Sequence, residues 1–235
     1  MPLHESDSII LKTYPLAEAD RIVVFFSREH GKMRGVANGV RRIKSRFGAS
    51  LEPLARSRVA FFQKENRELV RIRSSELIDS PMKLFEDYDR AVIAGYVAEL
   101  VDRFLPDHEV HDAVFRLFEL ARRSLVSGSE LELVRCYFEV WMLRLAGVFP
   151  DLFTCATCAD KLGVGEHRVL LPGLTSVACG RCQVREATEV PLTTIAALHW
   201  ILTTPLDRAV SGPASAGLGH IRQLNKIWIE RYFER

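Results

Sequence analysis

The hydrophobic pattern of the chain changes its period once, near Pro81, and this change limits the folds that the chain can adopt. Up to residue 80, short β-branched or aromatic runs alternate with turn residues such as His30-Gly31, which is typical of strands. Beyond Pro81, apolar residues recur every three or four positions, which is typical of helices. The sequence therefore predicts an α+β protein with a β domain at residues 1–80.

Five strands are expected in this first domain. They are predicted at residues 8–14, 21–27, 32–38, 57–64 and 68–77. Five short strands within 80 residues favour a small closed barrel, and the five-stranded oligonucleotide-binding (OB) fold is the type that we predict. An SH3-like barrel is the alternative.

The remainder of the chain is predicted to be helical, with one interruption. Helices are expected at about 84–105, 110–125, 129–147, 192–203 and 217–233. Ser129 and Glu132 have the spacing of a capping box at the start of the third helix. We therefore predict a helical domain at 81–150 and 191–235, interrupted by a loop-rich insertion at 151–190.

Charge is distributed unevenly along the chain. The formal net charge is only +2, but residues 28–73 hold thirteen basic and four acidic residues, a surplus of +9 that leaves −7 elsewhere. Such asymmetry indicates that one part of the protein binds a polyanion. A solvated surface that is basic without a binding role is the alternative.

The densest basic segment is residues 39–48, in the loop expected after the third strand. Its cationic side chains suit phosphate contacts that do not depend on base sequence. Strand alternation adds two arginines on one face of the last predicted strand. The residue pattern thus predicts DNA contacts at Arg41, Arg42, Lys44, Arg46, Arg71 and Arg73. Phe47 and Phe62 are candidates either for stacking on bases or for the barrel core.

Four of the five cysteines form two C-x-x-C pairs, Cys155/Cys158 and Cys179/Cys182. Each pair can bind one side of a tetrahedral metal, and thiolates suit zinc. Four protein ligands close the coordination shell, so we predict a structural Zn²⁺ in the insertion. Disulfide or redox pairs are the alternatives, and His167 could replace one cysteine. Cys136 is expected to be an ordinary buried residue.

Motifs of catalysis and of nucleotide binding are not found in the sequence. It contains no G-x-x-x-x-G-K-[ST] loop, no dinucleotide-binding fingerprint and no deaminase signature. We therefore expect a non-enzymatic protein that binds no nucleotide and has no catalytic residues. A zinc-dependent hydrolase is a distant alternative. With no apolar run of about 20 residues and no secretory start, we expect a cytoplasmic, nucleoid-associated protein without membrane contact.

Several segments resemble one known family. Residues 10–20 (ILKTYPLAEAD), 29–32 (EHGK), 37–39 (ANG), 41–46 (RRIKSR) and 51–54 (LEPL) resemble the amino-terminal domain of the RecO family of bacterial DNA repair proteins. A barrel followed by helices, with a four-cysteine insertion after residues 143–147 (LRLAG), resembles the family's layout over essentially the whole chain.

This resemblance implies a recombination mediator that binds single- and double-stranded DNA and anneals complementary strands. It implies that the protein works with RecR and single-strand-binding protein to help RecA onto coated DNA. It also implies DNA contacts at Lys32 and Arg34, in addition to the basic loop. Asn38 stands where relatives often carry a basic residue, so that phosphate contact does not carry over. An RNA-binding OB-fold protein acting in translation or RNA metabolism is the alternative function.

Overall fold

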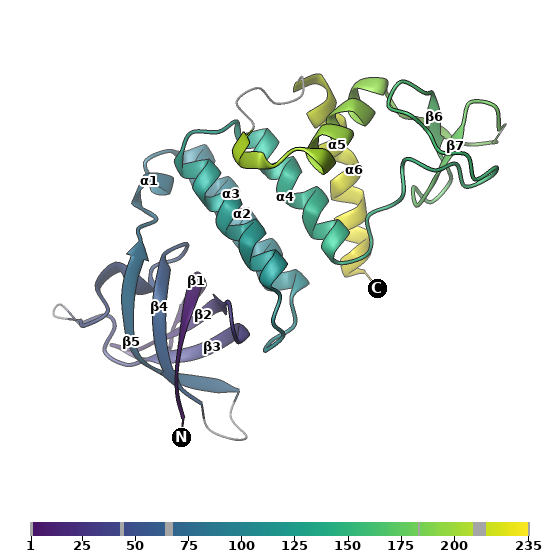
Figure 1. Cartoon of the computed structure of the whole chain (residues 1–235). Coiled ribbons are helices and arrows are strands. Elements are labelled where there is room, and N and C mark those ends of the chain that lie inside the picture. Colours follow the sequence, from purple (N-terminus) through teal and green to yellow (C-terminus); the bar gives the residue numbers. More distant parts are fainter. Residues whose placement is uncertain (1, 43–44, 64–67, 183, 209–214, 235) are drawn as a thin grey trace. The chain divides into compact units, whose positions relative to one another are not determined.

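The protein folds into two compact units, residues 1–131 and 132–235 (Figure 1). The computed structural model describes residues 2–42, 45–63, 68–182, 184–208 and 215–234. The first unit contains the barrel and three helices that follow it. The prediction separated the barrel from all helices at residue 80, whereas the contacts group these three helices with the barrel.

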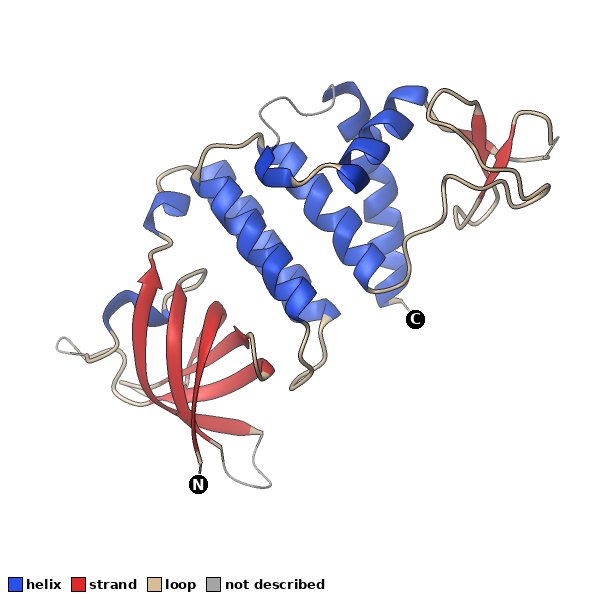
Figure 2. Ribbon diagram, viewed as in Figure 1, coloured by secondary structure: helices blue, strands red, loops and turns tan. Residues whose placement is uncertain are grey.

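Five strands form a closed barrel in the order β1-β2-β3-β5-β4. Figure 2 shows the strands in red. They are β1 (Leu3–Pro15), β2 (Arg21–Ser27), β3 (Gly31–Ala37), β4 (Arg56–Phe62) and β5 (Leu69–Asp79). All pairs are antiparallel except β3 and β5, whose parallel register closes the ring from Arg34↔Leu69 to Val36↔Arg71. This mixed barrel confirms the predicted fold class.

The first strand starts earlier than predicted, at Leu3 rather than residue 8. Its polar beginning pairs with β4, and its second half pairs with β2. Pairing with β4 ends at Ile9, and the register with β2 shifts just beyond it, between Ile10 and Lys12. A polar strand segment lacks the β-branched pattern on which the prediction depended.

The barrel core consists of inward-facing side chains from every strand and from the β3–β4 connection. Its buried members are Ile10, Val23, Phe25, Met33, Ala37, Phe47, Leu51, Ala55, Val59, Phe61, Val70 and Ile72. Gly35 of β3 lies against this core, because a Cβ there would be only 2.8 Å from the Ile72 side chain and 2.9 Å from Val70. A glycine thus allows β3 and β5 to approach at the closing seam.

Three helices complete the first unit: α1 (Met82–Phe85), α2 (Tyr88–Phe104) and α3 (Asp112–Val126). The prediction had a single helix at 84–105. The chain breaks instead at Asp87, where the backbone is extended. The Asp87 side chain caps α2, because its Oδ1 accepts from Arg90 N at 2.9 Å. The first N–H groups of a helix have no partner within the helix, and an aspartate at the N-cap accepts from one of them. A helix that ran through Asp87 would not need this acceptor.

The second unit contains α4 (Leu131–Leu145), α5 (Leu192–Thr203) and α6 (Ser215–Phe233). Helices on both sides of the insertion pack together: Trp141 Nε1 donates to Ile201 O at 3.2 Å, and Asn225 Nδ2 donates to Glu139 Oε2 at 3.0 Å. The insertion adds a small sheet of β6 (Arg168–Leu170), β7 (Val177–Cys179) and β8 (Thr188–Glu189). Among the described helices, none combines the length and apolarity needed to cross a membrane.

The β2–β3 turn depends on one glycine. Gly31 has φ +72°, and a Cβ at this position would overlap the backbone of Glu109 in the α2–α3 loop. We expect Gly31→Ala to lower the free energy of unfolding by more than about 2 kcal/mol, because left-handed strain alone costs about 1–2 kcal/mol. Urea unfolding of the full chain measures this loss.

Gly48 is the matched control. It also has a positive φ, +50°, but nothing lies within 4 Å of a Cβ built there. Gly48→Ala should therefore show the strain cost without the overlap. Equal losses for the two variants would contradict the close approach of the two loops.

Candidate nucleic-acid interface and metal centre

The outer face of the barrel is basic where β5 crosses it. Arg71 and Arg73 are exposed, while Val70 and Ile72 point into the core, as strand alternation predicts. On β4, Arg58 is exposed and Val59 is buried. The strands therefore present a row of cations to solvent, and the pairing of each cation decides whether it is available to a ligand.

Lys32, which the resemblance implied as a DNA contact, is buried where the barrel packs against α2. It is only 5% exposed. Its Nζ donates to Asp102 O at 2.6 Å and lies 3.2 Å from Asp107 Oδ1 and 3.4 Å from Asp102 Oδ1. The ammonium already has carboxylate partners away from solvent, so we leave Lys32 out of the candidate interface.

Asp102 holds a second barrel cation at the same place. Lys12 Nζ lies 2.5 Å from Asp102 Oδ2. Burial acts to raise the pKa of Asp102, but the hydrogen bond from Lys12 and the charge of Lys32 lower it below its ordinary value. Although burial acts in the opposite direction, the same hydrogen bond raises the pKa of Lys12. Asp102 is therefore ionised and pairs with both lysines, while Glu99 and Asp107 supply further negative charge to Lys12 and Lys32.

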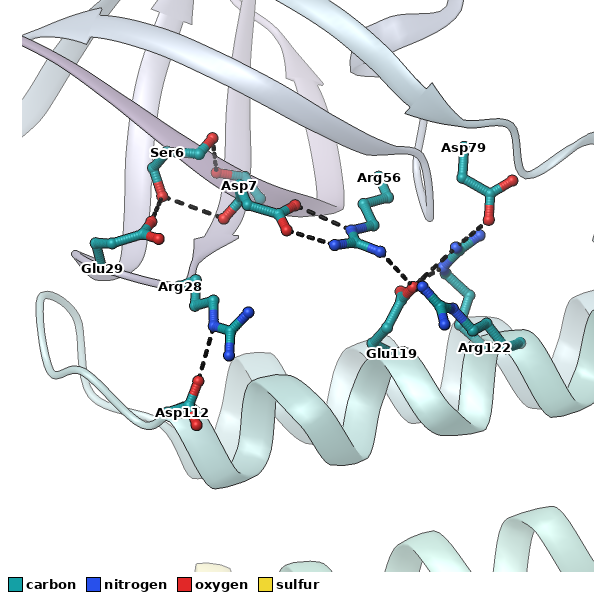
Figure 3. Close-up of polar contacts among 11 residues, drawn as sticks. Ser6, Asp7, Arg28, Glu29, Arg56, Asp79, Asp112, Glu119 and Arg122 are labelled. Carbon is teal, nitrogen blue, oxygen red and sulfur yellow. Dashed lines mark hydrogen bonds and ion pairs between the residues drawn. The ribbon is translucent and has the colours of Figure 1, made fainter. Parts of the chain in front are cut away.

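A parallel arrangement joins the barrel to α3 (Figure 3). Arg56 forms a two-pronged contact with Asp7, at 3.0 and 2.5 Å, and its Nη1 donates to Glu119 Oε1 at 2.8 Å. Glu119 also accepts from Arg122 Nε at 3.1 Å, and Arg122 pairs with Asp79 at the end of β5. The side chain of Arg122 is fully buried. This network lies within the first unit and ties its two layers together.

Other barrel arginines have carboxylate partners as well. The pairs are Arg21 with Glu52 at 3.3 Å, Arg28 with Asp112 at 2.8 Å, Arg34 with Asp107 at 3.1 Å and Arg58 with Glu5 at 3.7 Å. Arg34 is nevertheless exposed, so only part of its guanidinium is used. These surface pairs weaken the positive potential locally without adding much stability.

Five arginines differ from this group because they are exposed and have no carboxylate partner in the described part of the chain. They are Arg41, Arg42, Arg46, Arg71 and Arg73. All five belong to the set predicted from the residue pattern. Lys44, the sixth member of that set, lies outside the described residues. We call these five side chains the unpaired arginines; among the barrel cations that the structure describes, they are the ones with no ion pair to break before an anionic ligand binds.

A groove lies between β3 and β5 beside these arginines. Its volume is about 470 Å³, and it is lined by Val36, Asn38, Glu68, Leu69, Val70 and Arg71. Leu69 is exposed in it, and Arg71 contributes a charge. Apolar side chains beside a guanidinium can accommodate a base and its phosphate together.

The two candidate aromatic residues have different positions. Phe47 is buried in the barrel core, with the Arg46 guanidinium 4.9 Å from its ring centroid. Phe62 is half-buried on β4, with Arg73 at 5.9 Å. Phe47 therefore fills the interior, whereas Phe62 has a surface that a base could contact.

The four paired cysteines come together in the insertion. Their Sγ atoms all lie within 4.8 Å of one another, with Cys155–Cys182 at 4.0 Å and Cys158–Cys179 at 3.9 Å. These distances are far longer than a disulfide bond of about 2.05 Å. Zn–S bonds of about 2.3 Å in a tetrahedron place the sulfurs about 3.8 Å apart. The donor set and its spacing therefore fit a zinc ion.

The four thiols lie close enough to shift one another's pKa. The backbone N–H groups of Cys158 and Cys179 lower the pKa of Cys155 to about 6, and Cys179 N lies 3.3 Å from its sulfur. The hydrogen bond with Cys179 raises the pKa of Cys182. Four adjacent thiolates repel one another unless a cation binds between them. His167 lies outside the cluster and pairs with Glu189 at 3.0 Å.

Sequence reasoning missed the acidic partners of the barrel. Asp102 and Glu119 are separated from Lys32 and Arg56 by 70 and 63 residues. Both acids lie at buried positions of their helices, among the apolar residues. A carboxylate on the apolar face of a predicted helix is therefore the signal that could have found them, since buried acids require a cationic partner.

Removing the Asp102 carboxylate should destabilise the first unit. We expect Asp102→Asn to lower the free energy of unfolding at pH 7 by about 3 kcal/mol, because it removes the buried carboxylate that pairs with Lys12 and Lys32 and leaves Lys32 with the less buried Asp107 alone. Asp112→Asn, at an exposed pair, should cost less than about 1 kcal/mol. Urea titrations of both variants measure the difference, and equal losses would contradict the buried role of Asp102.

The Asp102 contribution should also depend on pH. The pKa of Asp102 is lower in the folded chain than its ordinary value of 3.8, so the unfolded chain binds more protons in acid. The stability difference between the wild type and Asp102→Asn is fully present above this value. It should shrink as the pH falls through the folded-state pKa, and a difference that does not depend on pH would contradict the assignment.

Comparison with known proteins identifies the family. The family described as "Recombination protein O N terminal" matches residues 1–81, and "Recombination protein O C terminal" matches residues 85–234. "DNA repair protein RecO" of Koribacter versatilis is 37% identical over 211 residues, which cover 90% of this chain and 85% of that protein. The protein of the same name from Nocardioides sp. is 34% identical over 218 residues, covering 91% of this chain and 87% of that protein. The chain therefore belongs to the RecO family of DNA repair proteins.

Proposed function

We propose that this protein is a non-catalytic mediator of DNA repair and homologous recombination. It binds single- and double-stranded DNA, anneals complementary strands, and helps load RecA, together with RecR, on DNA coated by single-strand-binding protein. Family membership supports the general role. The observation that carries the proposal is the division of the described barrel cations into paired and unpaired side chains, because the unpaired arginines can bind phosphates without breaking an ion pair.

The proposed interface consists of Arg41, Arg42 and Arg46 from the basic loop, with Arg71 and Arg73 from β5. Arg34 contributes in part, because Asp107 holds one side of its guanidinium. Contacts of this kind are made to phosphates and do not read base sequence. Both strand types can therefore bind, which suits a protein that works on broken DNA of any sequence.

Annealing follows from the same contacts. Two complementary strands repel each other through their phosphates, and bound guanidinium groups reduce that repulsion. Bases must remain free to pair, so the interface should hold the backbone and release the base edges. No nucleotide hydrolysis is needed for this step, since pairing itself is favourable.

The insertion is proposed to hold one structural Zn²⁺ through Cys155, Cys158, Cys179 and Cys182. The insertion has only short strands, of two or three residues. A small segment held together by such short strands is expected to gain much of its folding free energy from a bound metal. Four cysteine ligands leave no open position for water, so the zinc supplies structure and no catalysis.

The direct test of the function is strand annealing. Complementary oligonucleotides coated with single-strand-binding protein are mixed with the full chain, without nucleotide, and pairing is followed by fluorescence. We expect acceleration by the wild type and loss of acceleration when Arg41 and Arg42 are both changed to Gln. Preferential binding of RNA over DNA of equal length would instead favour a role in RNA metabolism.

The paired and unpaired arginines allow a matched comparison of DNA binding. The double variant Arg41→Gln/Arg42→Gln should weaken binding to all sequences alike and reduce the salt slope, d log K/d log[salt], by about 1.4 for single strands. Arg28→Gln/Arg58→Gln removes the same charge from paired positions. This control should change the affinity much less. Equal losses would show that net charge, and not the unpaired set, determines binding.

Metal analysis tests the cysteine site. The purified chain should contain about one zinc per molecule. Cys158→Ser should lose it, whereas Cys136→Ala, which changes the buried thiol of α4 outside the cluster, should keep it. Hydrogen exchange after chelation should increase in residues 151–190 and stay unchanged in the barrel. Full zinc occupancy in Cys158→Ser would contradict the assignment.

A further inference from the structure

Large apolar side chains are exposed together on α1 and the start of α2. Met82 is 63% exposed, Phe85 49%, Tyr88 82% and Val92 50%. Contiguous exposed apolar surface is uncommon unless it binds something. These four residues contribute little to the core, so their apolar character needs another explanation.

The exposed positions of α2 follow a regular spacing. Tyr88, Val92, Gly95 and Glu99 are exposed and are separated by four, three and four residues. This is the spacing of a seam that packs against another helix. The buried face of α2, with Val97, Leu100, Val101 and Phe104, points in a different direction and already has its partners within the first unit. We call the exposed row, together with Met82 and Phe85, the α2 seam.

Gly95 supplies a second, independent observation. It lies in the middle of α2, where glycine weakens a helix relative to alanine. Nothing lies within 4 Å of a Cβ built at Gly95, and the residue is exposed. No neighbour in the described part of the chain therefore requires a glycine there. Glycine on an exposed helix face allows the backbone of a second helix to approach closely, because no side chain stands between them.

The charges around the seam favour one kind of partner. Glu86, Asp87 and Asp89 are exposed at its amino-terminal end, and Glu99 is exposed at the other. Lys83 and Arg90, and Lys12 at 3.7 Å from Glu99, offset them only in part, so the negative charge is greatest at the amino-terminal end. Acidic residues around an apolar centre attract a partner with basic flanks and disfavour an acidic one. Tyr88, the most exposed of the large apolar residues of the seam, belongs to a type that often anchors interfaces.

We propose that the α2 seam is a docking surface for a basic amphipathic α-helix of another protein, which packs its apolar side chains on Phe85, Tyr88 and Val92 and approaches closely at Gly95. This surface is separate from the unpaired arginines of the barrel. One chain could therefore hold DNA through the barrel and a protein through the seam.

Photocrosslinking from the seam tests this proposal. The full chain carries p-benzoylphenylalanine at Tyr88 in cells that express it at its natural level, and crosslinked segments are mapped by mass spectrometry. We expect a segment of another protein with apolar residues at three- and four-residue spacing and a net positive charge. Its yield should fall at least tenfold in Gly95→Leu and in Val92→Lys. The same probe at Leu192, a similarly exposed apolar residue outside the seam, should not capture that segment.

Thermal melting and DNA binding separate docking from folding. Gly95→Ala and Gly95→Leu should melt at or above the wild-type temperature, because both residues favour helix and the space is open. Their affinity for DNA should be unchanged. A lower melting temperature for Gly95→Ala would overturn the argument from the glycine. Crosslinks to residues of this chain, to an acidic segment or to no protein, or a yield unaffected by Gly95→Leu, would overturn the proposal itself.

Discussion

Charge compensation between the barrel and its neighbouring helices is the constraint on which the first unit depends. The barrel carries many cations, and several of them lie where α2 and α3 pack against it. Lys32 is buried there, and an unpaired ammonium in that position would be very unfavourable. Asp102 and Glu119 supply the opposite charge from the helices. The helices therefore belong with the barrel physically, although the chain pattern changes at Pro81.

The same ion pairs also define the proposed DNA surface, because they occupy some of the barrel cations and leave others without a carboxylate partner. An arginine held by a carboxylate must break that contact before it can bind a phosphate, whereas Arg41 or Arg71 need not. The basic segment thus contains two groups of cationic side chains with different roles, those paired with carboxylates and the unpaired arginines. One stabilises the contact between barrel and helices, and the other remains at the surface as a site for a polyanion.

Local patterns in the sequence predicted the strands, most helices and the cysteine cluster, because each of these depends on residues close together in the chain. Pairing across long separations could not be predicted in this way. The role of Lys32 depends on Asp102, 70 residues away, and a count of charges in one segment cannot detect such a partner. The break before α2 was missed for a local reason: Asp87 is a good N-cap, but the apolar period continues through it. The polar start of β1 was missed because its pairing with β4 compensates for weak strand propensity.

The two populations of arginines and lysines also imply different evolutionary freedom. At Lys32 or Arg56, a change of charge removes one cationic partner of a buried carboxylate, so it should be tolerated best when Asp102 or Glu119 changes as well. These positions should therefore covary in an alignment of relatives. At Arg41 or Arg73, lysine can replace arginine without any second change, since a phosphate contact needs only a reachable cation. The pattern of covariation among relatives would thus record which cations hold the fold and which are free to bind DNA.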